Sequence, residues 1–202
     1  MVFITMGEIW AVILAAGESK RMGSPKMLLP FSDSTMIECV ITNVAKSAVD
    51  KIIIVLGAER ESLIQLADKL HIEYCYNKNY KKGMLSSVQC GFKNLPSVCK
   101  ASLVFQGDQP LITSKTINGV INAFALSEKG IVIPVYKKKR GHPILIDMKY
   151  RNDIDKLSPD FGLRSLANRF PSDVLEVETA ESGILRDFDT FEQYTKGKNL
   201  IK

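Results

Sequence analysis

Residues 10–26 have the sequence WAVILAAGESKRMGSPK, in which an unbroken apolar run passes directly into a loop of small and basic residues. The apolar run lacks the alternation of a half-exposed strand, so it predicts a strand that is buried on both faces of a parallel sheet. Two later runs, KIIIVL at residues 51–56 and ASLVF at residues 101–105, have the same character. We therefore expect these runs to be the central strands of the fold.

Amphipathic helices are predicted between these strands. Apolar residues recur with the helical period in residues 36–48, 63–70 and 85–95, and a Thr35/Glu38 capping box precedes the first of these segments. Strands that alternate with helices indicate right-handed crossovers and a doubly wound sheet. After Asp108 the pattern predicts, in order, a helix at 113–126, strands near 131–136 and 142–147 joined as a hairpin by the turn 137–141, a short helix after Gly162, a strand at 174–177 and a last helix through Phe191 and Tyr194.

The expected fold class is therefore α/β. We predict a single three-layer α/β/α domain over residues 1–202, with a Rossmann-like, mostly parallel sheet and a β-hairpin insertion on its later side. No linker, internal repeat or low-complexity segment indicates a domain boundary.

Composition argues against several classes of protein. The 46% hydrophobic and 24% charged residues are ordinary for a globular chain, and the longest apolar run, residues 9–16, is far shorter than the ~20 residues of a membrane span. A net charge of +5 without a basic stripe between aromatic residues predicts no nucleic-acid partner. The four cysteines form no CxxC pair, so we expect neither a disulfide framework nor a zinc site. Glu8 rather than a basic region precedes the apolar run; we therefore expect a cytoplasmic protein with no membrane attachment.

The loop after the first strand is the first place to look for a ligand, because open parallel sheets bind ligands at the carboxyl ends of their strands. Ala15, Ala16 and Gly17 keep side chains small there, Gly17 and Gly23 permit unusual φ values, and the N–H groups of such a loop can surround phosphate oxygens. Arg21 and Lys26 add positive charge. The loop has neither a Walker A nor a GxGxxG pattern, and the simpler alternative is a small-residue turn with two solvated basic residues.

The pattern LAAGxSxRMGxPK at residues 14–26 resembles the signature of the molybdenum cofactor nucleotidyltransferases. Further stretches resemble segments of that family in the same order: YKKGMLSS at 80–87, GDQP at 107–110, RGHP at 140–143 and DFDT at 187–190. The resemblance implies that the first loop wraps the triphosphate of a nucleotide, with Arg21, Lys26 and Asp108 in the catalytic roles. The nucleotide-binding residues that it implies are Leu14, Ala15, Ala16, Gly17, Ser19, Arg21, Gly23, Lys26, Gly83, Ser87 and Asp108.

Two aspartates are candidates for a Mg²⁺ site. Asp108 follows a predicted buried strand directly, so its carboxylate should lie at the same sheet edge as the first loop, although GDQP could also be a plain turn. Mg²⁺ takes one or two carboxylates together with substrate phosphates. The resemblance implies that Asp189, rather than Asp187, is the second ligand. The alternative for Asp189 is an N-cap of the last helix.

The acceptor side rests on the resemblance. It implies that Gln109, Arg140, Gly141, His142 and Arg164 line a pocket for a pterin and its phosphate. Without the resemblance, residues 137–143 would be a solvated hairpin tip with an ordinary surface histidine. The stretch DFGLR at 160–164 departs from the family's segment, because Pro159 replaces a glycine; Phe191 departs from the usual proline.

The predicted reaction is transfer of CMP from CTP to the terminal phosphate of molybdopterin cofactor, with Mg²⁺ as cofactor and release of pyrophosphate. Guanylyl-transferring relatives have glycine where this chain has Ala16, which favours CTP. The acceptor is already an anion, so no protein nucleophile is needed. The alternatives are a nucleotidyltransferase that uses GTP or acts on a sugar phosphate, and a non-catalytic protein that delivers the cofactor to a recipient molybdenum hydroxylase.

Overall fold

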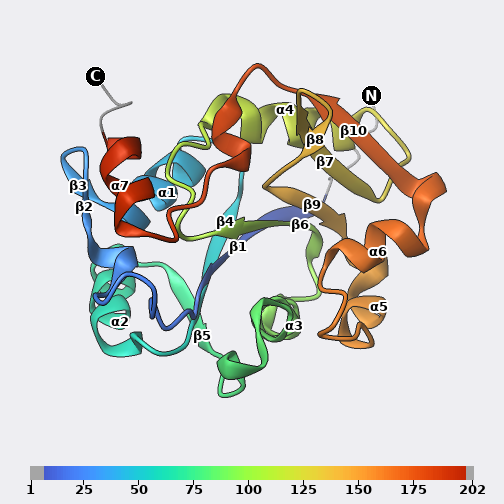
Figure 1. Ribbon diagram of the computed structural model, residues 1–202. Coiled ribbons are helices and arrows are strands. Elements are labelled where there is room, and N and C mark those ends of the chain that lie inside the picture. Colours follow the sequence, from blue (N-terminus) through green and yellow to red (C-terminus); the bar gives the residue numbers. More distant parts are fainter. Residues whose placement is uncertain (1–6, 199–202) are drawn as a thin grey trace.

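The computed structural model describes residues 7–198, which form one α/β domain around a mixed sheet (Figure 1). The strands lie in the order β10-β7-β9-β6-β1-β4-β5, and β8 pairs with β7 outside this path. Their bounds are β1 Glu8–Ala15, β4 Lys51–Leu56, β5 Glu73–Tyr76, β6 Cys99–Gln106, β7 Ile131–Tyr136, β8 Lys139–Arg140, β9 Ile144–Asp147 and β10 Val174–Glu178.

The three predicted central strands are confirmed: β1 pairs in parallel with β4 on one side and with β6 on the other. Successive side chains of β1 enter opposite cores because side chains alternate along a strand. Ala11 and Ile13 join the core on one face of the sheet, whereas Val12 and Leu14 join the core on the other face. Apolar burial on both faces explains why this strand is an unbroken apolar run.

Helices cover both faces of the sheet and confirm the three-layer prediction (Figure 1). The Thr35/Glu38 capping box is present at the start of α1. Part of the predicted periodicity, after residue 45, lies beyond the end of that helix. The helices are α1 Met36–Ala45, α2 Arg60–Lys69, α3 Met84–Asn94, α4 Ser114–Ala125, α5 Arg151–Asp155, α6 Arg164–Arg169 and α7 Phe191–Lys198.

The predicted hairpin is confirmed, since β7 and β9 pair antiparallel, and the structure adds a two-residue strand, β8, to the connection between them. The tight turn at Lys137 and Lys138 joins β7 to the two-residue β8, and the chain then returns as β9, which runs antiparallel between β6 and β7. β9 begins at Ile144, two residues later than predicted. The strand order brings the loop that precedes β9 against β6, so residues 141–143 lie against the sheet, whereas Arg140 remains exposed.

The sequence patterns did not predict several short elements. The edge strand β5 has only one buried side chain, Cys75, so it lacks an apolar run. The small hairpin of β2 (Pro30–Phe31) and β3 (Ser34–Thr35) separates the first loop from α1, and α5 is a five-residue helix. In the described part of the chain, no helix combines the length and the apolar character that a membrane crossing requires.

Candidate active site

Three segments that are distant in the sequence meet at the carboxyl edge of the sheet: the loop after β1, the turn after β6 and the segment before α7 (Figure 1). The last segment is anchored by aromatic packing. Phe188 lies 5.4 Å from Phe31, ring centroid to centroid, and the Tyr194 hydroxyl donates to the Pro30 carbonyl. These contacts hold Asp189 opposite the first loop.

The first loop takes its shape from Ser19 and Gly23. Both have positive φ, 50° and 67°, and the Ser19 hydroxyl accepts a hydrogen bond from the Lys26 backbone N–H at 3.1 Å. The expectation of unusual φ is therefore met at Gly23 and wrong at Gly17, whose φ is not in the left-handed region. The turn is made two residues later, at Ser19, so Gly17 supplies an exposed backbone instead.

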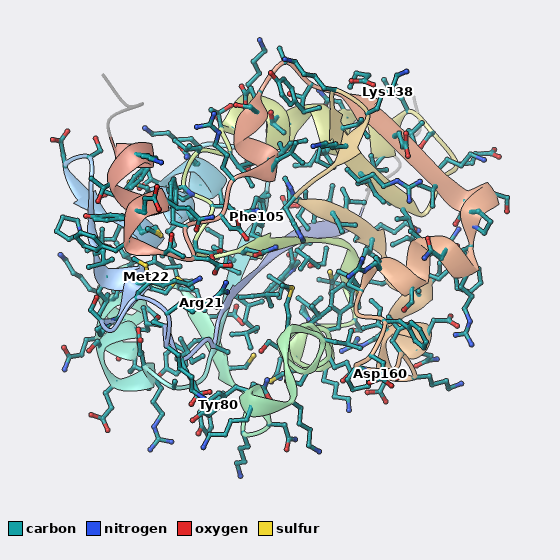
Figure 2. All side chains as sticks on the ribbon, in the orientation of Figure 1. Arg21, Met22, Tyr80, Phe105, Lys138 and Asp160 are labelled. Carbon is teal, nitrogen blue, oxygen red and sulfur yellow. The ribbon has the colours of Figure 1, made fainter. Side chains whose placement is uncertain are left out.

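The predicted charged residues form one connected group. The Lys26 ammonium contacts Asp108 Oδ2 at 2.5 Å and Asp189 Oδ1 at 3.0 Å, and Arg21 contacts Asp189 Oδ2 at 2.7 Å. The Lys26 and Asp108 side chains are only 12% and 7% exposed, while Arg21 is 69% exposed. Figure 2 shows Arg21 on the loop that faces this edge. Lys26 thus joins the carboxylates internally, and Arg21 extends the group to solvent.

Asp189 does not cap the last helix with its side chain. The Thr190 hydroxyl accepts from the Gln193 N–H, and Gln193 Oε1 accepts from the N–H groups of Asp189 and Thr190. The Asp189 carboxylate is therefore free of a capping role and faces Lys26 and Arg21.

The charges of this group stabilise one another. Burial acts to lower the pKa of Lys26, but the neighbouring Asp108 and Asp189 carboxylates outweigh it and raise that pKa. Burial acts to raise the pKa of Asp189, but the hydrogen bond and charge of Lys26, with Arg21, outweigh it and lower that pKa. The stabilisation is lost only as pH rises through the raised pKa of Lys26, above 10.5, or falls through the lowered pKa of Asp189, below 3.8.

The donor set suits a magnesium ion that is shared with substrate. Two carboxylates already bind one cation, the Lys26 ammonium, so they present hard oxygen donors to a common point. Residues 7–198 contain no group of three or more His, Cys, Asp or Glu side chains that could hold a metal by themselves. Mg²⁺ takes one or two carboxylates plus phosphate oxygens and water, so the residues that fit it here are Asp108 and Asp189.

Two adjoining cavities surround the charged group. A cavity of about 220 Å³ contains Ser87 and Gly83 from the start of α3 at one end and Lys26 and Asp108 at the other. A cleft of about 270 Å³ is formed by residues 17–22 with Lys26 and Asp189. We call them the nucleotide cavity and the phosphate cleft. Of the predicted nucleotide-binding residues, Ala15 and Gly23 line neither; those that line one or both are Leu14, Ala16, Gly17, Ser19, Arg21, Lys26, Gly83, Ser87 and Asp108.

A third cavity, of about 330 Å³, contains most of the residues predicted for the acceptor. Arg140, Gly141, His142 and Arg164 line it, together with an apolar wall of Ile131, Ile133, Ile144, Ile146, Leu163, Leu166 and Ala167. We call it the acceptor cavity. Gln109 is not among its lining residues; it is buried, and its Oε1 has no hydrogen-bond partner among the described residues.

His142 is not a surface histidine at a hairpin tip. Its Nδ1 lies 3.2 Å from the Val104 carbonyl oxygen, which can only accept, so Nδ1 carries the proton. Burial lowers the pKa of His142 despite this hydrogen bond and the opposing charges of Asp108 and Asp187, so the ring is neutral at pH 7. Nε2 is then a hydrogen-bond acceptor. The tip itself is at Lys137 and Lys138; Figure 2 shows Lys138 far from Arg21.

Two polar residues that lie next to predicted nucleotide-binding residues were not predicted from the sequence. Glu59 follows β4, and its Oε2 is buried without a hydrogen-bond partner in the described chain; burial raises its pKa, with the Ser19 hydroxyl and the Lys26 charge opposing. Asn77 follows β5 and contacts Ser87. The carboxyl-edge argument could have found Glu59, because it follows a predicted strand. Nothing in the pattern marks Asn77, since no apolar run predicts β5.

Gly57 is required where β4 approaches the first loop. A Cβ at Gly57 would lie 2.3 Å from the Ala16 carbonyl oxygen and 2.7 Å from the Ala16 Cα. We expect Gly57→Ala to destabilise the fold by about 1–3 kcal/mol, as overpacking does, and to weaken nucleotide binding at the first loop because Ala16 must move. Thermal and denaturant unfolding measure the first effect, and calorimetric titration the second.

Gly119 provides the matched control. It lies inside α4, and a Cβ there would meet nothing within 4 Å. Gly119→Ala should therefore stabilise the protein by about 0.5–1 kcal/mol through helix propensity. Equal stability of the two variants would contradict the close approach at Gly57.

A cleft with basic side chains beside paired carboxylates suits the transfer of phosphate-bearing groups from nucleotides, in which catalysis depends on positioning and charge neutralisation. Comparison with known proteins agrees. Residues 11–174 match the family described as MobA-like NTP transferase domain, and the chain belongs to this family of nucleotidyltransferases.

Similar proteins of nearly the same length are known. The molybdenum cofactor cytidylyltransferase of Escherichia coli (strain K12) is 28% identical over 195 residues, 96% of this chain and 97% of that protein. The nicotine blue oxidoreductase of Paenarthrobacter nicotinovorans is also 28% identical over 195 residues, 92% of this chain and 94% of that protein. The fold is shared with a nucleotidyl transferase from Methanothermobacter thermautotroptrophicus (Mth528), with a TM-score of 0.82, 20% identity and coverage of 96% and 97% of the two chains.

Proposed function

We propose that this protein transfers CMP from CTP to the terminal phosphate of molybdopterin cofactor and releases pyrophosphate, with Mg²⁺ as cofactor. The observation that carries the proposal is the buried Lys26 ammonium between Asp108 and Asp189, where the nucleotide cavity meets the phosphate cleft. The similarity to a molybdenum cofactor cytidylyltransferase supports this choice of substrates.

In this reaction an oxygen of the acceptor phosphate attacks the α-phosphorus of CTP, and the bond from the α-phosphorus to the bridging oxygen of the β-phosphate breaks. The acceptor oxygen is already deprotonated, so no residue has to remove a proton. Arg21 and Lys26 neutralise the charge that develops on the leaving pyrophosphate. Asp108 and Asp189 would hold Mg²⁺, which when bound stabilises charge on the phosphate oxygens. The loop N–H groups position the triphosphate for attack.

The acceptor cavity supports a flat heterocycle over a sugar. Its wall is formed mainly by isoleucine and leucine side chains, which would leave the hydroxyl groups of a sugar phosphate without partners. The neutral His142 offers Nε2 as an acceptor for a ring N–H. Arg140 is held by Glu176 at 2.7 Å, whereas Arg164 forms no ion pair within residues 7–198 and is the better candidate for an acceptor phosphate.

CTP should be the preferred donor. We expect pyrophosphate release with CTP to exceed that with GTP or ATP by at least about tenfold in kcat/KM, because base selection rests on a few hydrogen bonds near Ala16. Parallel assays with the three nucleotides, Mg²⁺ and molybdopterin cofactor measure this. A strong preference for GTP would contradict the choice of donor.

The alternatives differ in what they predict for the same assay. A sugar-phosphate transferase would release pyrophosphate only with the sugar acceptor, and a delivery protein or an oxidoreductase like the second relative would release none. A recipient molybdenum hydroxylase remains the proposed partner for the product. The proposed compartment is the cytoplasm, in keeping with four cysteines that are not joined in disulfides.

A further inference from the structure

Asn77 is a buried amide that holds a side chain of the nucleotide cavity. It lies between β5 and α3 and is 4% exposed. Its Nδ2 donates to Ser86 Oγ at 2.9 Å and to Ser87 Oγ at 3.0 Å, and its Oδ1 accepts from the Asn79 backbone N–H at 2.9 Å. The backbone N–H can only donate, so it fixes the orientation of the amide: the carbonyl faces Asn79 and the NH₂ group faces the serines.

The direction of this hydrogen bond determines where the Ser87 proton goes. Ser87 Oγ accepts from Asn77, so its own O–H must point elsewhere. The neighbouring Ser86 hydroxyl uses its proton within the chain, on the Gly83 or Asn79 carbonyl, at 2.8 or 3.0 Å. No acceptor for the Ser87 proton is found among residues 7–198, and Ser87, itself 4% exposed, lines the nucleotide cavity. The cavity therefore contains a free hydroxyl donor.

The other buried polar side chain of this cavity, Asp108, is already bonded to Lys26. A single buried donor distinguishes cytosine from guanine when it faces the two positions of the base edge nearest the sugar; at the third position, N4 of cytosine and O6 of guanine, the polarity is reversed. Cytosine presents two adjacent acceptors, O2 and N3, whereas guanine presents two adjacent donors, N1–H and N2–H₂. A buried donor that faces another donor leaves both unsatisfied, which is more costly than a missing hydrogen bond.

We propose that Asn77 is a specificity-determining residue: by fixing Ser87 as a hydrogen-bond donor, it makes the nucleotide cavity select the acceptor edge of cytosine over the donor edge of guanine. Asn77 acts through Ser87 and is a positioning residue. This inference rests on the proposed function, because it assigns the base of the donor nucleotide to this cavity.

The test reverses the hydrogen bond without changing the shape of the side chain. In Asn77→Asp both oxygens of the new carboxylate accept, so the Ser87 hydroxyl must donate to that carboxylate and present its lone pairs to the cavity. Equilibrium binding of CTP and of GTP, measured by calorimetric titration without acceptor, gives the affinity ratio. We expect the CTP-to-GTP ratio to fall by about tenfold. The added charge weakens both nucleotides alike, so the ratio, rather than either affinity, is the diagnostic readout.

Two serine variants complete the experiment. Ser87→Ala removes the donor without adding charge and should lower the ratio, because CTP loses a hydrogen-bond partner and GTP no longer faces an unsatisfied donor. It keeps the test decisive if Asn77→Asp does not fold. Ser86→Ala removes the other Asn77 partner, outside the cavity lining, and should keep the wild-type ratio. If the wild-type protein prefers CTP, and both Asn77→Asp and Ser87→Ala keep the wild-type CTP-to-GTP affinity ratio, the inference is wrong and the proposed function is unaffected. A wild-type protein that binds neither nucleotide would overturn the proposed function and the inference with it.

Discussion

Lys26→Met is expected to lower kcat/KM for CTP by about 100- to 1,000-fold, the usual cost of removing one preorganised group that stabilises transition-state charge. Methionine keeps the length of the side chain and loses its charge. The ammonium occupies the meeting point of the nucleotide cavity and the phosphate cleft, so no other residue in the described chain is placed to replace it there. Steady-state pyrophosphate release measures the loss.

A second lysine–aspartate pair, at the opposite end of β6 from Asp108, provides the control. Lys100, near the start of β6, contacts Asp147 Oδ2 at 3.0 Å, at the opposite edge of the sheet from Asp108. Lys100→Met should leave turnover within about twofold of wild type, because a surface ion pair contributes little. Similar losses in both variants would indicate a general effect of removing lysine and would contradict the assigned role.

The Lys26 variant should also lose stability in a pH-dependent way. Lys26 lowers the pKa of Asp189, and that contribution is present above the ordinary aspartate pKa and lost as pH falls through the lowered value. Without Lys26 the contribution is absent. The deficit in unfolding free energy relative to wild type should therefore be largest near pH 7 and shrink below about pH 4, where carboxylates become protonated. Denaturant unfolding at several pH values tests this.

Asp108→Asn is expected to lower kcat by about 100-fold or more and to raise the Mg²⁺ concentration needed for half-maximal rate, because one of two carboxylates is lost. Binding of molybdopterin cofactor should not change, since Asp108 does not line the acceptor cavity. Turnover against Mg²⁺ concentration and a separate titration with the cofactor distinguish the two effects.

Asp147→Asn is the control for this variant. Asp147 is similarly buried and accepts from the Lys149 N–H, a role that asparagine can keep. It should retain wild-type turnover and Mg²⁺ dependence. If wild type shows no turnover while it binds the cofactor, the delivery alternative is favoured; if Asp108→Asn turns over normally, the carboxylate has no part in the chemistry.

Strands that are apolar on both faces could be predicted directly from the sequence, whereas the partly exposed β5 could not. The strands β1, β4 and β6 are apolar on both faces, so local composition reports their environment directly. β5 has one buried residue in four, so it has no apolar run. The hairpin of β7 and β9 could be predicted from the local pattern, but the pairing of β9 with β6 could not, because pairing with a distant strand is a non-local property.

The active site also has parts that could be predicted from local sequence and parts that could not. Asp108 and the first loop follow buried strands, so the sheet topology places both at one edge before any contact is known. The joining of Asp108 and Asp189 by Lys26 depends on where the chain returns after β10, which no local pattern encodes. Asn77 could not be predicted for a further reason. Its proposed role depends on which partner donates each hydrogen bond, and residue type alone does not specify that.

Asp189 follows all the strands of the sheet in the chain, so its position affects when the active site is completed during synthesis. A chain whose synthesis stops after β10 contains every strand of the sheet but lacks the segment that carries Asp189. Such a nascent chain has the first loop, Lys26 and Asp108, but only half of the carboxylate pair. The capacity to react with a triphosphate is thus among the last properties that the growing polypeptide acquires, and an incompletely translated chain should be inert toward nucleotide.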